Sequence, residues 1–74
     1  MNLKEPKGTY KGNLLEALMV KLEGDIAIAK ANVEVYRSNP AGIGEHPGIV
    51  EAIETEIAKI AEANDKIETI KKFF

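Results

Sequence analysis

The segment SNPAGIGEHPG, residues 38–48, divides the chain into two long runs that each carry apolar side chains at helical spacing. Proline disfavours the helical conformation of the residue before it, so the first run cannot continue as a helix through Pro40. Two long helices joined by a short connection fold back on each other as an antiparallel hairpin. The sequence therefore predicts an all-α protein with helices over 13–38 and 47–73 and a corner over 39–46.

The first helix is expected to begin at Asn13, because Asn is a favoured N-cap residue and Glu16 stands where a capping box requires it. Apolar residues then recur at alternating spacings of four and three, which places them on one helical face. This stripe contains Leu15, Met19, Leu22, Ile26, Ala29, Val33 and Tyr36. Gly24 interrupts the helix at a cost of about 1 kcal/mol relative to Ala, or marks a place where another backbone comes close.

The second helix is expected to begin near Pro47, because the first helical position needs no backbone N–H. Its apolar stripe consists of Ile49 or Val50, then Ile53, Ile57, Ile60, Asn64, Ile67, Ile70 and Phe74. Asn64 is the polar member of this stripe. A buried Asn in a helical seam can set the register or the oligomeric state. Alternatively, the stripe turns toward solvent at this point, and the sequence leaves both interpretations open.

A chain of 74 residues without cysteine has a thin core and no disulfide to support it. Oligomerisation is the usual remaining source of stability for so short a chain. Further apolar residues flank the two stripes: Leu14, Leu18, Ile28 and Val35 on the first helix and Ile49, Ile70 and Phe73 on the second. We therefore predict a homodimer in which two hairpins form a four-helix bundle with coiled-coil packing.

Residues suited to catalysis or metal binding are scarce in this chain. His46 is the only histidine, which excludes a metal site with several histidines, and there is no cysteine nucleophile. The acidic residues of the second helix are expected on a solvated face; they are Glu51, Glu54, Glu56, Glu62, Asp65 and Glu68. The sequence thus predicts no catalytic residue, no cofactor and no metal, and argues against an enzyme.

The Gly-rich corner and the chain end are the candidate interaction sites. Three glycines before a helix N-terminus can present N–H groups to an anion, but the corner lacks the spacing and the Lys of a phosphate loop. Turn geometry explains the same glycines. Phe73 and Phe74 either cover Leu14 and Leu15 or form an exposed handle. The candidate interaction residues are Tyr10, Ile43, His46, Phe73 and Phe74.

A basic segment offers an alternative function. Residues 1–12 contain Pro and Gly without helical or alternating apolar spacing, so we expect a flexible arm with three lysines and Tyr10. Together with Lys30 and Arg37 this arm could contact RNA. The formal net charge of −2 and the single aromatic residue of the arm argue against this alternative.

The run NPAGIGEHPGIVEAIETEIAKIAEANDKI, residues 39–67, resembles a group of small uncharacterised proteins of marine tailed bacteriophages. The resemblance implies phage origin and a helical hairpin, and it assigns no activity. The hypothesis is a noncatalytic helical module that self-associates and docks onto a host or virion protein. No apolar run approaches the length of about 18 residues that a membrane span needs. We expect a soluble protein in the cytoplasm, that of the host cell if a phage encodes it.

Overall fold

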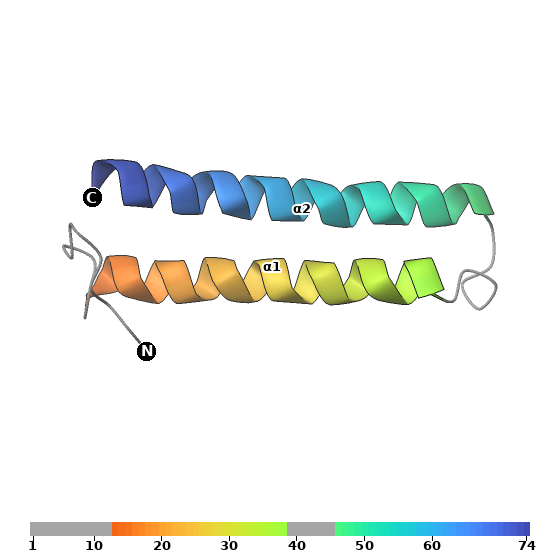
Figure 1. Cartoon of the computed structure of the whole chain (residues 1–74), viewed down its shortest axis with the longest axis horizontal. Coiled ribbons are helices and arrows are strands. Elements are labelled where there is room, and N and C mark those ends of the chain that lie inside the picture. Colours follow the sequence, from red (N-terminus) through yellow and green to blue (C-terminus); the bar gives the residue numbers. More distant parts are fainter. Residues whose placement is uncertain (1–12, 39–45) are drawn as a thin grey trace.

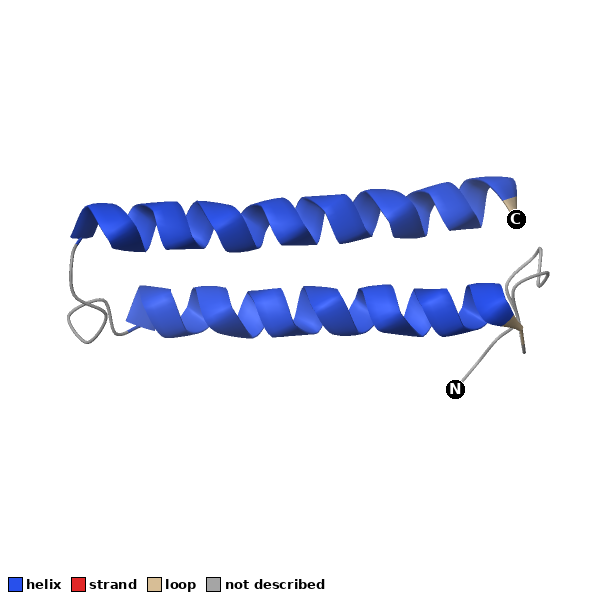
Figure 2. Ribbon diagram, turned by 180° about the vertical axis from the view of Figure 1, so that it is seen from behind, coloured by secondary structure: helices blue, strands red, loops and turns tan. Residues whose placement is uncertain are grey.

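The computed structural model describes residues 13–38 and 46–74. This part of the chain forms two helices, α1 over Leu14–Ser38 and α2 over His46–Phe73. They lie side by side in opposite directions, with the end of α2 beside the start of α1 (Figure 1). Seen from behind, the described residues contain helices and no strand (Figure 2). The predicted all-α helical hairpin is confirmed.

Asn13 caps α1 as its residue type predicts. Its Oδ1 accepts hydrogen bonds from the backbone N–H groups of Leu15 and Glu16, at 2.9 and 3.3 Å. These two groups would otherwise have no partner in the first helical turn. The observed helices each differ from the predicted ranges by one residue at the start. The predicted arm, 1–12, and residues 39–45 of the corner lie outside the described residues.

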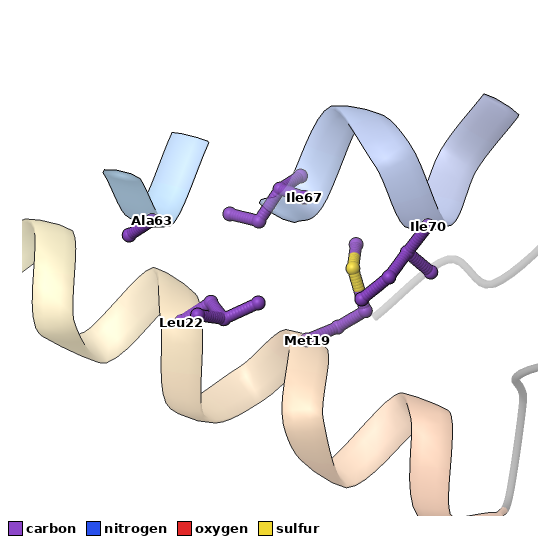
Figure 3. Packing of buried hydrophobic residues seen from close by; sticks show 5 residues of the cluster. All are labelled: Met19, Leu22, Ala63, Ile67 and Ile70. Carbon is purple, nitrogen blue, oxygen red and sulfur yellow. The ribbon is translucent and has the colours of Figure 1, made fainter. Parts of the chain in front are cut away.

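The contact between α1 and α2 is a narrow apolar seam. Met19 and Leu22 of α1 pack against Ala63, Ile67 and Ile70 of α2 (Figure 3). All seven stripe residues predicted on α1 are buried or half-buried, as expected. No large side chain in the described part of the chain is less than 2% exposed, so the core is thin.

The stripe predicted on α2 was wrong at three positions, Ile57, Asn64 and Phe74, which are exposed. Ile57 is 50% exposed and Asn64 is also exposed, while Glu56 and Ala63 are buried in their place. The buried row repeats every seven residues: Ile49, Glu56, Ala63 and Ile70. Ile70 was predicted in the stripe, and Ile49 was predicted there as an alternative to Val50; both are part of the seam.

A choice between two neighbouring rows explains this correction. One row of the α2 seam is common to the predicted and the observed arrangement: Ile53, Ile60 and Ile67. The two arrangements differ in which of the neighbouring rows joins it, the row through Ile57 or the row through Glu56. The row through Ile57 and Asn64 continues at the same spacing to Lys71, so turning this row inward would bury an amide and an ammonium group, which is costly. The observed row buries one polar side chain, Glu56, and its carboxylate accepts hydrogen bonds from Asn32 and Lys59.

Candidate interaction surface

A groove of about 320 Å³ runs between α1 and α2. Ala29 and Ala63 are small, so the two helices leave space where these residues meet the groove. Leu22 and the buried Glu56 also contribute to it. The remaining lining residues are Lys21, Asp25, Ile28, Lys59, Glu62 and Lys66. The groove is open to solvent and mixes charged with apolar side chains.

Large apolar side chains surround this groove on one side of the hairpin. Leu14, Leu18, Ile28 and Val35 all fall on the spacing of four and three that includes Lys21 and Asp25 of the groove. Phe73 follows Lys66 by two helical turns and lies on the same side of α2. All five side chains are exposed, Leu14 by 87% and Ile28 by 64%. We call this side, with the groove and these five residues, the groove face.

On the opposite side of the hairpin, α1 is charged where it borders the seam. Here the positions of α1 next to the seam hold Glu16, Glu23, Lys30 and Arg37. The exposed large apolar residues away from the groove face are Val20, Val50 and Ile57, apart from the terminal Phe74. The groove face is therefore the more apolar of the two sides.

Charges on the groove face are arranged in bands across both helices. The Asn32 amide donates to Glu56 Oε1 at 3.2 Å, which fixes the level of α1 relative to α2. Counting from this contact in opposite directions, Asp25 lies within one residue of the level of Glu62, and Lys21 lies within one residue of the level of Lys66. The face thus carries a positive band and, one turn away, a negative band.

Ion pairs run along the helices and join the two bands. Lys21 Nζ lies 2.7 Å from Asp25 Oδ2 on α1, and Lys66 Nζ lies 3.1 Å from Glu62 Oε2 on α2. Each pair spans one helical turn. Residues of like charge consequently stand on the two sides of the groove at each level.

Glu56 is the buried charge of the seam, 7% exposed. Its carboxylate accepts a hydrogen bond from the Asn32 amide and one from Lys59 Nζ, at 3.2 and 3.3 Å. The Asn32 hydrogen bond is the main cause that lowers the pKa of Glu56. Lys59 also lowers this pKa through its hydrogen bond and its charge, and burial opposes both. The expectation that Glu56 lies on a solvated face was wrong.

The structure places the predicted interaction residues in different ways. Tyr10 and Ile43 lie outside the described residues. His46 is the first residue of α2, and its side chain also lies outside the described part. Phe73 is exposed, with Lys72 Nζ 5.4 Å from its ring centroid, and Phe74 is 49% exposed.

The last residues of α2 decide whether Phe73 and Phe74 cover Leu14 or form an exposed surface. α2 is helical to Phe73, and the Phe74 N–H donates to the carbonyl of Ile70 at 2.9 Å. Leu14 is nevertheless almost fully exposed, so the two phenylalanines do not cover it. The end of α2 is an exposed aromatic surface on an ordered helix.

Asn64 is exposed, so it does not set the register between α1 and α2. Of the two interpretations of Asn64, the one in which it faces solvent is correct for the single hairpin. Asn32 and Glu56 supply the polar contact in its place. A register-setting role for Asn64 between two copies stays a prediction.

Of the basic residues proposed for RNA contact, Lys30 and Arg37 lie away from the groove face, and the arm lies outside the described residues. Lys30 is exposed, and Arg37 Nη1 forms an ion pair with Glu34 Oε2 at 2.7 Å. This ion pair partly neutralises the basic surface at the end of α1. No structural feature of these residues favours RNA over other partners.

Metal-binding clusters and membrane-crossing helices are both absent from the described residues. Within 13–38 and 46–74, no three His, Cys, Asp or Glu side chains gather where they could hold a metal ion. Neither α1 nor α2 combines the length and apolar character of a membrane-crossing helix.

Comparison of the chain with protein-family models, curated proteins and solved structures gives no match. The resemblance to phage proteins over residues 39–67 therefore stays a prediction. Function has to be argued from the hairpin and its groove face.

Proposed function

We propose that this chain is a noncatalytic protein-interaction module that self-associates through its groove face. The observation that carries the proposal is the set of five exposed apolar side chains on one side of the hairpin: Leu14, Leu18, Ile28, Val35 and Phe73. Isolated apolar residues are normal on protein surfaces, but a contiguous patch marks an interaction site.

The thin core of the hairpin supports self-association as well. Two helices share a single seam, and one of its buried positions is occupied by Glu56. A second hairpin on the groove face would give each helix another apolar neighbour, as in four-helix bundles. Association therefore adds burial that a single hairpin cannot provide.

Sedimentation equilibrium over a range of micromolar concentrations tests this proposal. We expect the mass of the wild type to rise from that of one chain to that of two. Ile28→Glu places a charge in the groove face and should weaken association at least about tenfold, because an unpaired charge would be buried. A single-chain mass for the wild type throughout this range would refute self-association.

Ile57→Glu is the matched control. It changes the same residue type at a comparably exposed position, but Ile57 lies outside the groove face. We expect this variant to associate as the wild type does. If both variants weakened association equally, the groove face would not be the interface.

A further inference from the structure

We infer that the groove face binds a second copy of this chain turned end for end, so that the positive band of each copy lies on the negative band of the other. The inference rests on the proposed self-association and adds its orientation. The bands are formed by Lys21 with Lys66 and by Asp25 with Glu62.

Within a single hairpin, ion pairs along each helix join the two bands, but like charges lie opposite each other across the groove. Lys21 and Lys66 face each other across the groove, and so do Asp25 and Glu62. Like charges at such positions repel, and the ion pairs along each helix compensate only partly. A surface carrying the opposite bands would complement the groove face, and the same face supplies it when inverted.

A two-fold axis at right angles to the helices produces this inversion. It places α1 on α1 of the second copy in the opposite direction, and α2 likewise on α2. With the axis at the level of residue 23, Lys21 of each copy meets Asp25 of the other, because each lies two residues from the axis.

The same axis also brings opposite charges of the two α2 helices together. Counted from the Asn32–Glu56 contact, the level of residue 23 on α1 corresponds to residue 65 on α2, one residue from the midpoint of Glu62 and Lys66. Glu62 and Lys66 lie on either side of that level, so Glu62 of each copy meets Lys66 of the other. Two independent charge pairs therefore agree on one axis.

Apolar residues on α1 match about this axis too. Leu18 and Ile28 lie five residues from it on opposite sides, so Leu18 of each copy meets Ile28 of the other. The two α1 helices overlap over residues 14–32, about 28 Å.

The alternative two-fold axis runs parallel to the helices. It places α1 on α2 of the second copy with each level unchanged. Lys21 would then meet Lys66, and Asp25 would meet Glu62, so both bands would face their own sign. Opposed like charges disfavour this arrangement.

Disulfide trapping in the full chain tests the orientation, and the absence of native cysteine makes the background clean. We expect a mixture of Leu18→Cys and Ile28→Cys chains to give at least about five times more crosslinked dimer than either variant alone. In the end-for-end dimer, two copies of residue 18 lie about 15 Å apart along the helices, beyond disulfide reach.

The control mixture combines Leu18→Cys with Thr69→Cys. Residue 69 lies level with residue 18 in the hairpin, so this mixture crosslinks only if the axis runs parallel to the helices. Crosslinking here instead of at Leu18–Ile28, or at neither pair in a protein that sediments as a dimer, overturns the orientation and leaves self-association standing. A chain that sediments as a monomer overturns both.

A charge exchange gives a second test that does not depend on crosslinking. The double variant Lys21→Asp with Asp25→Lys keeps the ion pair within α1 and restores opposite charges between two exchanged copies. We expect it to associate with itself but to mix with the wild type less than random exchange predicts, because mixed dimers oppose like charges. Free mixing would contradict the inferred orientation.

Discussion

Leu22→Ala probes the seam that holds the two helices together. The Leu22 side chain is 3% exposed and points between Ala63 and Ile67 of the facing helix (Figure 3). Its removal exposes no polar group and leaves the cap of α1 intact. Any loss of stability therefore measures the packing of α1 on α2.

The magnitude follows from the buried methyl and methylene groups that the substitution deletes. Three carbons at about 0.8 kcal/mol each give a loss of about 2.4 kcal/mol. A closed core would add the cost of a cavity and raise the loss toward about 5 kcal/mol. Because Leu22 also lines the open groove, neighbouring side chains and water can occupy the space, and we expect about 2–3 kcal/mol.

Thermal unfolding followed by circular dichroism measures this loss. For a chain of this length, about 2–3 kcal/mol lowers Tm by about 10–20 °C. Both chains must be compared at one concentration where sedimentation shows the same species, because association shifts Tm.

Val20→Ala serves as the control, since Val20 is exposed on the side of α1 away from the seam. It should change stability by less than about 0.5 kcal/mol. A shift below about 3 °C for Leu22→Ala would refute the packing of the seam.

Two further substitutions test single features of the hairpin. Glu56→Gln should destabilise the protein most at neutral pH. The pKa of Glu56 is lowered from 4.5 by folding, so its contribution is fully present above that value and is lost as pH falls through the lowered pKa. Tm measured between pH 7 and 3 should therefore show the two proteins converging in acid, and a constant difference would contradict the role of the carboxylate. Gly24→Ala should raise the free energy of unfolding by about 0.5–1 kcal/mol in a urea titration, because a Cβ there meets no atom within 4 Å. A loss of stability would show that another backbone approaches Gly24.

The sequence predicted α1 more accurately than α2, and the reason is physical. On α1 every stripe position is apolar, so hydrophobicity alone identifies the buried face. On α2 the buried row contains Glu56, and the neighbouring row begins with Val50 and Ile57, which look more suitable for a core. A strict repeat of seven through Ile49, Glu56, Ala63 and Ile70 would have predicted the observed row.

The candidate site was predicted in part. The sequence identified five exposed apolar residues as flanking the seam, and these five lie on the groove face: Leu14, Leu18, Ile28, Val35 and Phe73. The charge bands could not be predicted in the same way, because they depend on which residues of α1 and α2 lie level. That information comes from a contact across the hairpin, between Asn32 and Glu56.

Polar residues select the geometry of two contacts, the seam between α1 and α2 and the proposed contact between two groove faces. Isoleucines on both sides of the Ile53, Ile60 and Ile67 row would allow α2 to rotate by one position, but Glu56 finds the Asn32 amide only in the observed rotation. In the proposed dimer, aliphatic side chains such as Leu18 and Ile28 would pack at several offsets between the two copies. The charge bands would bring unlike charges together at one offset alone. Apolar burial therefore drives the contact between α1 and α2 and would drive the dimer contact that we propose. In each, the less favourable polar positions select one arrangement among those that burial alone would permit.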